Sequence, residues 1–387
     1  MERVMIHCDC DNYFASVEEK HNPTLMKIPF AVCGDPAMRH SIVMAKNSLA
    51  KRAGVKTGFS YTQARQICPA LGYVKADMPK YLAETEAARG VYLKYSEKIA
   101  PYGMDESWLD LTDTGATLKD AEQIADLIRI EIMYSLGLSA SVGVSFNYIF
   151  SKMGSDLNKP NGTVVITREN YKERIWPLPA EELLFVGSAR KKTLCSAGIN
   201  TIGDIAQADP QYMAKLLGKV GYDLWCFANG DDSSFDPTID EIGSIGNTIT
   251  PPKDICTEQD ASAVIYLLVN AIVARLKKHS LKTRCVSICT RNNKFDRAIR
   301  QRTLAQFTDN VNAIFNHAFD LFKIHYNWQN PLRSIGVRVD NLDEHDQISL
   351  FENDNCDLCV DISSRIKNLT QRFGKLEFEK TATAREW

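Results

Sequence analysis

Short apolar runs alternate with amphipathic helical patterns through the first 167 residues. The runs that predict strands lie at 2–9, 28–34, 71–76 and 103–111, and the stretch 157–167 predicts a Pro-Asn-Gly turn followed by a strand. The helical patterns lie at 12–22, 58–69, 78–100 and 117–137, and two further stretches, 41–55 and 139–150, begin as strands and become helical. Two of these helices are long enough to back a sheet, so we predict an α+β layer.

The rest of the chain changes pattern twice. Short helices dominate from Trp176 to about Gly230, and residues 236–246 are poor in helical signals, which predicts a linker. Residues 244–341 alternate strand, helix, two basic strands, helix and strand, which predicts a separate small α/β unit. The tail has one amphipathic helix candidate, whose apolar residues are Leu358, Ile362, Ile366, Leu369 and Phe373.

Two adjacent carboxylates, Asp105 and Glu106, stand inside the predicted strand 103–111. Neighbouring strand side chains point to opposite faces, so at least one charge turns toward a core unless it has a partner. Asp9 ends the first predicted strand, and antiparallel pairing would bring the three carboxylates to one sheet edge. Such ligands suit Mg²⁺, and two ions roughly 3.5–4 Å apart support in-line phosphoryl transfer. From spacing alone, a residue that caps a turn explains the pair equally well.

Charge is distributed unevenly, although the net charge of the 387 residues is only −2. Residues 241–341 are net basic, and the segments on both sides are net acidic. Between 275 and 302 the chain has ten basic residues and a single acidic residue, Asp296. A solvated helix face normally mixes both signs, so this clustering predicts contact with a phosphate backbone.

The remaining composition is typical of an intracellular globular protein. Eleven cysteines without regular spacing favour reduced thiols over disulfides, and the lone pair Cys356 and Cys359 lacks the further ligands that zinc needs. No run approaches the roughly 18 apolar residues that cross a bilayer, and the N-terminus lacks the order of a signal peptide. We therefore expect a cytoplasmic, monomeric protein without a membrane partner.

Four motifs, in this order and spacing, together resemble the Y-family translesion DNA polymerases, which include bacterial polymerase IV and UmuC-like enzymes. They are HCDCDNYFASVEE from His7, GMDESWLDLTD from Gly103, SVGVSFNYIFSKMGSDLNKPNG from Ser141, and AGINTIGDIA from Ala197. The resemblance covers about residues 1–380. It implies low-fidelity, template-directed DNA synthesis past damaged bases, with primer-template DNA and deoxynucleoside triphosphates (dNTPs) as partners.

The resemblance also implies a multidomain, right-hand polymerase. Its parts would be a palm at 1–10 and 77–166, small fingers at 11–76, a helical thumb with a helix-hairpin-helix at 167–234, an α/β little finger at 242–341 and a tail at 342–387. The basic stretch 275–302 falls in the little finger, which is the expected DNA-binding domain.

The resemblance assigns the active site residue by residue. Asp9, Asp105 and Glu106 match the family's metal ligands, and the backbone carbonyl of Cys10 matches a further ligand. The implied cofactor is two Mg²⁺ ions, for which Mn²⁺ would substitute. Asp11 does not match a catalytic position, and we expect a structural role for it.

Three further residues match positions around the incoming nucleotide. Phe14 aligns with the family's steric gate, an aromatic ring set where a ribose 2′-OH would lie, although the pattern alone favours a core aromatic. Tyr13 is expected beneath the base or sugar. Lys159 matches a lysine that contacts the triphosphate, and an exposed lysine is the alternative.

The fingers and thumb depart from the family pattern. Many members have a Tyr and an Arg three residues apart that grip the triphosphate, where this chain has Ser48 and Lys51, closer to UmuC-like members. Lysine keeps the charge but has no bidentate fork, so triphosphate binding would be organised differently. In the thumb hairpin VGSARKK, Gly187 is kept and Ala189 replaces the second glycine.

The predicted DNA-contacting residues come from the thumb hairpin and the basic stretch. They are Gly187, Arg190, Lys191, Lys277, Lys278, Lys282, Arg284, Arg291, Arg297, Arg300 and Arg302.

The tail sequence QISLF resembles the short peptide that docks bacterial polymerases on the sliding β-clamp. Its residues are Gln347, Ile348, Ser349, Leu350 and Phe351. Two apolar anchors and one amide suit a pocket on a partner, although packing on their own domain is the alternative.

Two other functions are open to the same residues. A nucleotide cyclase also uses carboxylates on a palm-like sheet, but it has no use for the basic stretch 275–302. A catalytically silent DNA-binding or clamp-binding module would be expected to lack some of the metal ligands, and all three are present here.

Overall fold

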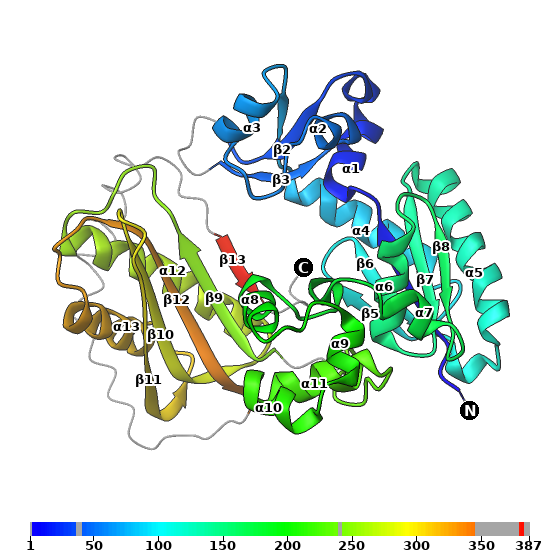
Figure 1. The fold of residues 1–387 in the computed structure, drawn as a ribbon. Helices are drawn as coiled ribbons and strands as arrows, with labels where there is room; N and C mark the ends of the chain where they lie inside the picture. Colours follow the sequence, from blue (N-terminus) through cyan, green and yellow to red (C-terminus); the bar gives the residue numbers. More distant parts are fainter. Residues whose placement is uncertain (1, 36–40, 239–241, 345–378, 383–387) are drawn as a thin grey trace. The chain divides into compact units, whose positions relative to one another are not determined.

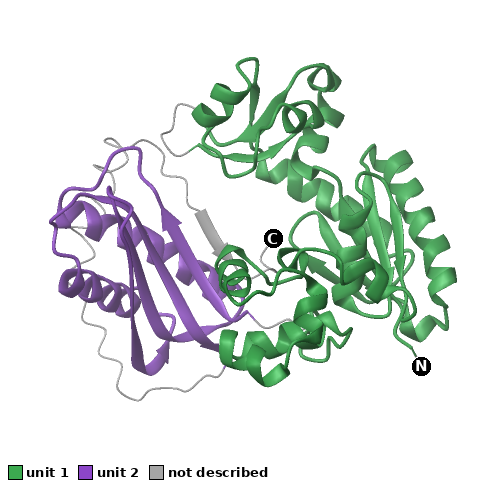
Figure 2. Cartoon of the chain, in the orientation of Figure 1, with its two compact units in different colours: residues 1–239, 387 green, residues 240–386 purple. Residues whose placement is uncertain are grey.

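The computed structural model describes residues 2–35, 41–238, 242–344 and 379–382, the last four as backbone (Figure 1). The chain divides into two compact units, one up to residue 239 and one from residue 240 onward (Figure 2). The division falls inside the stretch 236–246 that the sequence predicts as a linker.

The first unit contains a five-stranded sheet, whose strands β5, β6, β7 and β8 are labelled in Figure 1. Its middle strand, β1 (Met5–Cys10), pairs antiparallel with β6 (Glu106–Asp110) and with β7 (Ala140–Ser145). β5 (Ile99–Tyr102) and β8 (Thr163–Ile166) complete the order β5-β6-β1-β7-β8. Every residue of β1 is buried, because helices cover both faces of the sheet.

Three helices cover this sheet. α4 (Met78–Tyr92) and α5 (Leu118–Glu131) share an apolar core with the β1 residues Ile6 and Cys8. α6 (Tyr148–Leu157) packs on β7 at Gly143, where an added Cβ would lie 1.9 Å from the Ser151 carbonyl oxygen. The absent side chain therefore lets α6 approach the sheet closely, beside β1.

A small layer separates β1 from α4 in the sequence. α1 (Tyr13–His21) follows β1 and leads through the 3₁₀ turn Pro23–Lys27 into a sheet of order β3-β2-β4. The remaining elements of this layer are β2 (Phe30–Cys33), β3 (Val43–Lys46), α2 (Ser48–Arg52), α3 (Tyr61–Ile67) and β4 (Gly72–Lys75).

Short helices form the end of the first unit, as the sequence predicts. They are α7 (Tyr171–Ile175), α8 (Ser188–Ser196), α9 (Ile202–Gln207), α10 (Pro210–Leu217) and α11 (Lys219–Ala228). Their apolar residues share one core with Phe146 and Phe150 from the region of α6.

The second unit has one sheet of order β11-β10-β12-β9-β13 packed on two helices. Its elements are β9 (Ser244–Ile249), α12 (Glu258–Lys278), β10 (Lys282–Asn292), β11 (Arg297–Thr308), α13 (Val311–His325), β12 (Leu332–Asp343) and β13 (Glu379–Ala382). Among the described residues, α12 is the one helix long and apolar enough to cross a membrane, and more than half of that stretch is buried inside the unit, as in a core helix.

Most predicted elements are present, and the predicted multidomain α+β architecture is confirmed. The strand predicted at 103–111 begins only at Glu106, because Gly103, with φ 78°, starts a turn between β5 and β6. The helix predicted at 78–100 ends at Tyr92, since Ile99–Tyr102 pairs with β6 as β5. The tail supplies β13, which the pattern did not predict, and the predicted tail helix lies outside the described residues.

Candidate active site

Asp9 and Glu106 are directly opposed on neighbouring antiparallel strands. The register pairs Asp9 of β1 with Glu106 of β6, so both side chains leave the sheet on the same face. That face is the one α6 covers, because His7, two residues before Asp9, pairs with Gly143 beneath the helix. Two of the three carboxylates predicted to converge are therefore directly opposed, at the ends of two inner strands rather than at an edge strand.

Asp105 lies in the turn between β5 and β6, one residue before the strand. Its backbone carbonyl accepts a hydrogen bond from the Cys10 amide at 2.9 Å, which ties the turn to the end of β1. The turn answers the steric question raised by the sequence, since two adjacent carboxylates need not both fit a pleated strand.

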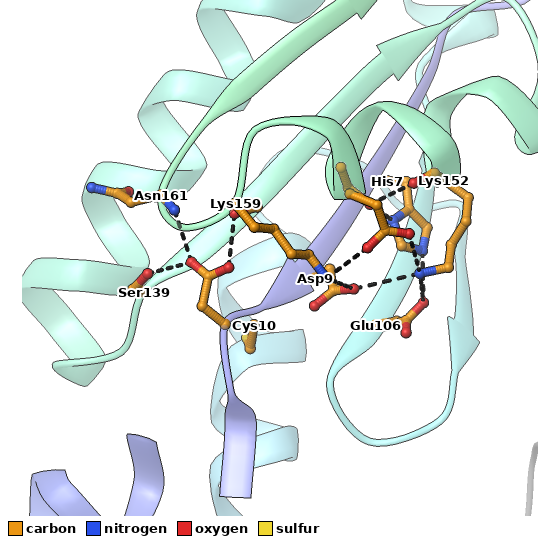
Figure 3. A network of polar contacts seen from close by, with 12 residues as sticks. His7, Asp9, Cys10, Glu106, Ser139, Lys152, Lys159 and Asn161 are labelled. Carbon is orange, nitrogen blue, oxygen red and sulfur yellow. Dashed lines mark hydrogen bonds and ion pairs between the residues drawn. The ribbon is translucent and has the colours of Figure 1, made fainter. Parts of the chain in front are cut away.

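Lys152 and Lys159 supply positive charge to the carboxylates (Figure 3). Lys152 Nζ lies 2.6 Å from Glu106 Oε2 and 3.4 Å from Asp9 Oδ2. Lys159 Nζ donates to Asp9 Oδ2 at 2.6 Å and lies 2.8 Å from Asp156 Oδ1. Lys159 was predicted to lie in the site, whereas Lys152 was not.

The carboxylates titrate differently because their surroundings differ. Burial and the nearby charge of Glu106 raise the pKa of Asp105 to about 6. The same two causes raise the pKa of Asp9, in spite of the two lysines. Burial would also raise the pKa of Glu106, but contacts with His7 and Lys152 outweigh it and lower that pKa. The positive charge of Lys152 and Lys159 therefore does not fully neutralise the carboxylates of the cleft.

His7 stands behind Glu106 and is fully buried. Its Nε2 lies 3.3 Å from Glu106 Oε2, and its Nδ1 lies 2.8 Å from the Ser155 hydroxyl. Burial lowers the pKa of His7 to about 4, although the negative charge of the nearby Glu106 carboxylate opposes this shift. The ring is therefore neutral at physiological pH and restrains Glu106 without adding charge.

Asp11 has a structural role, as predicted. Its buried carboxylate accepts hydrogen bonds from the hydroxyls of Ser139 and Ser141 and from the Asn161 amide, the last at 2.9 Å. These bonds join the end of β1 to the turn after α6. Because Lys159 lies in that turn, Asp11 helps to hold the lysine near Asp9.

An open cleft of about 250 Å³ lies over these groups. Its lining is Asp9, Cys10, Asn12, Tyr13, Phe14, Met44, Ala45, Lys46, Thr57, Asp105, Glu106 and Lys159. The cleft thus unites the three predicted metal ligands with four of the other predicted site residues.

The two aromatic residues at the start of α1 differ in their surroundings. The Phe14 ring is partly buried and lies 4.7 Å from the ring of Tyr81. The Tyr13 ring is buried, and its hydroxyl donates to the Tyr81 carbonyl oxygen at 2.6 Å and contacts Thr85. Tyr13 therefore supports α1, whereas Phe14 presents a ring to the cleft.

Cys10 also reaches the cleft with its backbone rather than its thiol. The buried thiol lies 3.7 Å from the Tyr92 hydroxyl, on the core side of the sheet. Burial raises the pKa of this thiol to about 12, so it stays protonated. The predicted role of Cys10 concerns its backbone carbonyl and does not require the thiol.

Ser48 and Lys51, predicted to bind the nucleotide, are exposed on α2 and are not part of the cleft lining. Met44, Ala45 and Lys46 of β3 line the cleft from this layer instead. Sequence reasoning missed Lys46, because a lysine at the end of a short strand is ordinarily exposed.

The three carboxylates differ from a preformed metal site in their spacing and in their lysine contacts. Within the described ranges, no three His, Cys, Asp or Glu side chains meet closely enough to hold one ion, and Lys152 and Lys159 contact the carboxylates. The donor chemistry nevertheless fits, since Asp9, Asp105 and Glu106 are hard oxygen ligands on one cleft and two of them have raised pKa values. Asp9, Asp105 and Glu106 would hold such an ion only with Lys152 and Lys159 displaced from them.

The predicted thumb residues begin α8. Gly187 is its N-cap residue and has an ordinary φ of −78°, and Ala189 is the second residue of the helix. Arg190 donates to the Phe185 carbonyl oxygen at 2.6 Å, and Lys191 pairs with Glu181.

The predicted basic residues of the second unit do not share one face. The helix-packed face of β10 has Val286 and Ile288, whose register partners on β11 are Arg302 and Arg300. Arg291 and Arg297 are also register partners. Arg291 stands at an alternate position to Val286 and Ile288 along β10, so this pair lies on the open face of the sheet.

The other basic residues of this unit lie near its helix end and sheet rim. Lys277 and Lys278 are exposed in the last turn of α12. Lys282 begins β10, and Arg284 donates to the Leu304 carbonyl oxygen at 3.0 Å. The predicted clamp-binding segment 347–351 lies outside the described residues.

Two family models match the chain. The model of the impB/mucB/samB family matches residues 8–156, and the model of that family's C-terminal domain matches residues 243–350. The first match contains the three carboxylates and Lys152 but ends before Lys159, and the second contains the basic sheet.

Curated relatives match over nearly the full length. DNA polymerase IV of Acetivibrio thermocellus is 40% identical, over 97% of this chain and 96% of that protein. DNA polymerase IV of Alkaliphilus oremlandii is 33% identical over 92% of this chain and 90% of that protein. DNA polymerase IV 1 of Bacillus subtilis is 30% identical over 99% and 94%.

Solved structures share the fold. A Y-family DNA polymerase chimera of Dbh and Dpo4 superimposes with a TM-score of 0.79 at 24% identity, over 88% of this chain and 100% of that chain. A post-insertion binary complex of Dbh DNA polymerase has a TM-score of 0.62 at 24% identity, over 88% and 100%.

Proposed function

Because the chain belongs to the impB/mucB/samB family and is a Y-family DNA-directed DNA polymerase, we propose that it copies damaged template DNA with low fidelity by metal-assisted nucleotidyl transfer. The observation that carries this proposal is the pairing of Asp9 with Glu106 beside Asp105 in one cleft. Lys159 and Phe14 line the same cleft, and together these residues suit the phosphates and the sugar of a nucleoside triphosphate.

Asp9, Asp105, Glu106 and the Cys10 carbonyl would hold two Mg²⁺ ions, with Mn²⁺ as a substitute. Such ions lower the pKa of a primer 3′-OH and offset charge on the phosphates. His7 restrains the Glu106 carboxylate, and Asp11 keeps the turn of Lys159 in place.

Lys159 is proposed to bind the triphosphate of the incoming nucleotide. In the described structure it pairs with Asp9 and Asp156, so a polyphosphate would compete with these carboxylates for its ammonium group. Phe14 is proposed to exclude the 2′-OH of ribonucleotides, since its ring is packed against Tyr81 and cannot yield freely. Tyr13 supports that ring.

Primer-template DNA is proposed to contact the thumb hairpin through Gly187, Arg190 and Lys191, and the second unit through its basic residues. We propose the palm, fingers, thumb and little finger at the boundaries predicted from the sequence. We also propose docking on a sliding β-clamp through residues 347–351, and a monomeric polymerase that acts in the cytoplasm.

Primer extension on undamaged and abasic templates tests the proposal. Each dNTP is supplied alone and then together, with Mg²⁺, Mn²⁺ or EDTA, and wild type is compared with Glu106→Gln. We expect template-directed, error-prone extension that needs the cation and is lost in the variant. Absence of extension by folded, DNA-binding wild type would refute the proposal, and cation-independent extension would refute its metal-assisted step.

A nucleotide cyclase is not favoured. The second family model covers the basic unit, and the matched relatives are named DNA polymerases along almost their whole length. Incubation with each nucleoside triphosphate alone, without DNA, checks this alternative through the absence of a cyclic product.

A further inference from the structure

The fingers side of the active-site cleft ends in a lysine. β3 runs from Val43, which is buried in the core of its layer, to Lys46, which lines the cleft with Met44 and Ala45. Lys46 Nζ donates a hydrogen bond to Thr57 Oγ1 at 2.9 Å, and Thr57 lines the same cleft. The Lys46 ammonium group therefore lies beside a cleft that also contains three carboxylates and Lys159.

The backbone around Lys46 is held firmly. The next residue, Asn47, is buried, and its Oδ1 accepts hydrogen bonds from the amides of Phe30 and Ala50 at 3.2 and 3.0 Å. Its Nδ2 donates to the Ile28 carbonyl oxygen at 2.9 Å. Asn47 thus joins β2, β3 and the start of α2, which sets the point from which Lys46 extends.

Lys46 differs from the other cleft lysine in the charge of its partner. Lys159 contacts the carboxylates of Asp9 and Asp156, whereas the hydrogen-bond partner of Lys46 within the described part of the chain is a neutral hydroxyl. Burial lowers the pKa of Lys46, and the positive charge of Lys51 adds to this effect. A partly buried cation with a cationic neighbour gains stability when an anion binds beside it.

The two residues of this layer that the sequence predicts to bind the triphosphate lie outside the cleft lining. Ser48 and Lys51 are exposed on α2 and do not line the cleft. Lys51 is still close enough to Lys46 to affect its charge state. Its contribution is therefore positive potential around the cleft rather than direct contact.

We propose that Lys46 is the fingers residue that binds the triphosphate of the incoming nucleotide, with its ammonium group leaving or sharing the Thr57 hydroxyl. Lys159 would act from the palm side of the same cleft, so the polyphosphate would lie between two lysines. This inference rests on the proposed polymerase function. It replaces direct contacts by Ser48 and Lys51 with one by Lys46.

Nucleotide binding by the protein with primer-template DNA tests the inference. Ca²⁺ replaces Mg²⁺ and a dideoxy-terminated primer prevents extension, so that equilibrium dissociation constants of a correct dNTP can be measured. The variants are Lys46→Ala, Lys46→Arg and Lys51→Ala. The matched control is Lys56→Ala, because Lys56 is an exposed lysine of the same layer that does not line the cleft.

We expect Lys46→Ala to weaken dNTP binding about 10-fold, the scale of one charge-assisted hydrogen bond. Lys46→Arg should recover most of that loss, Lys51→Ala should lose about 2- to 3-fold, and the control should match wild type. The KM for dNTP should rise in Lys46→Ala with little change in kcat, since this contact is made before and during the reaction.

Competition by nucleotides of different length separates contact from structure. The loss in Lys46→Ala should be largest for the triphosphate and absent for the monophosphate, whereas a general distortion of the cleft would weaken both equally. Equal loss for both, a normal dNTP affinity in Lys46→Ala, or a larger loss in Lys51→Ala would each overturn the inference. If one of these results is found and wild type still extends primers, the inference about Lys46 fails but the proposed polymerase function stands. If wild type neither binds dNTP nor extends primers, the inference and the proposed function are both refuted.

Discussion

The Lys152 ammonium group lies 2.6 Å from Glu106 Oε2, so a buried monovalent cation contacts a carboxylate proposed to bind a divalent one. Asp9 and Asp156 lie 3.4 Å from the same nitrogen. Although burial would lower it, these carboxylates raise the pKa of Lys152, so its charge persists at physiological pH. The lysine therefore limits carboxylate repulsion when no metal ion is bound.

Replacing this lysine should expose that repulsion. In EDTA at neutral pH, Lys152→Met should lower the free energy of unfolding by about 3 kcal/mol, because buried carboxylates lose their partner. Urea unfolding followed by circular dichroism measures the loss, and Lys119→Met, an exposed lysine of α5, serves as the control. Mg²⁺ should restore more stability to the Lys152 variant than to wild type. Equal stability of both variants in EDTA would contradict this role.

The raised pKa of Asp105, about 6 against an ordinary 3.8, gives a stability change with a defined sign. Between these values the folded state holds a proton that the unfolded state has released, so the unfolding free energy of the metal-free protein falls as pH rises. Asp105→Asn removes this dependence. The variant should match wild type below pH 4 and be more stable by about 3 kcal/mol above pH 7.

Urea unfolding in EDTA at several pH values measures this difference, and primer extension by the same variant should be absent while DNA affinity is retained. Asp113→Asn, an exposed aspartate outside the site, is the control. A stability difference independent of pH would show that Asp105 does not titrate as proposed, and wild-type extension by the variant would remove it from the active site.

The sequence predicted the part of the site that follows from strand pairing. Asp9 and Glu106 each lie beside the end of an apolar run, and antiparallel pairing then forces them together. Local pattern was less informative for Asp105, because a turn of Gly103 and its neighbours competes with a strand over the same residues. Of the adjacent residues Asp105 and Glu106, only Glu106 lies on the strand.

Lys152 and Lys46 were missed because their roles depend on contacts distant in sequence. The sequence pattern around Lys152 indicates an ordinary helix lysine. Lys152 reaches Glu106 only because Gly143 lets α6 lie close to the sheet. A glycine in a buried strand was a signal for such an approach. Lys46 depends on the placement of Thr57, for which the sequence offers no equivalent signal.

Phe14 should exclude ribonucleotides because its ring is packed against Tyr81 and lines the cleft. Phe14→Ala should therefore raise the ratio of ribonucleotide to deoxyribonucleotide incorporation by at least 100-fold, on the order of the few kcal/mol that a steric clash costs. Single-nucleotide insertion measures both substrates on one preparation, so any general loss of activity cancels in the ratio. An unchanged ratio would assign Phe14 to packing alone.

The segment 347–351 should matter only with a clamp present. Deletion of these residues should abolish the stimulation of synthesis by a loaded sliding clamp and leave clamp-free extension at the wild-type rate, since two apolar anchors would be lost from a partner pocket. Extension with and without the loaded clamp measures both rates. A double change of Leu350 and Phe351 to Ala should match the deletion, and an equal loss without clamp would indicate a role in folding instead.

The arginines of the second unit allow a test of which sheet face meets DNA. Arg291 and Arg297 are paired on the open face, whereas Arg300 and Arg302 are paired with residues of the helix-packed face, and Arg302 lies 3.5 Å from His317 of α13. Helices α12 and α13 pack on that second face and keep a duplex away from most of it. The open face is thus the better surface for a phosphate backbone.

Changing Arg291 and Arg297 together to Ala should weaken DNA binding and reduce the slope of log affinity against log salt by about 2, because two phosphate contacts are lost. Changing Arg300 and Arg302, which both lie on β11, removes the same charge and should alter the slope by less than half as much. Fluorescence anisotropy with a labelled primer-template over a range of salt concentrations measures both slopes. Equal slopes for the two pairs would mean that net charge, rather than the face of the sheet, determines DNA binding.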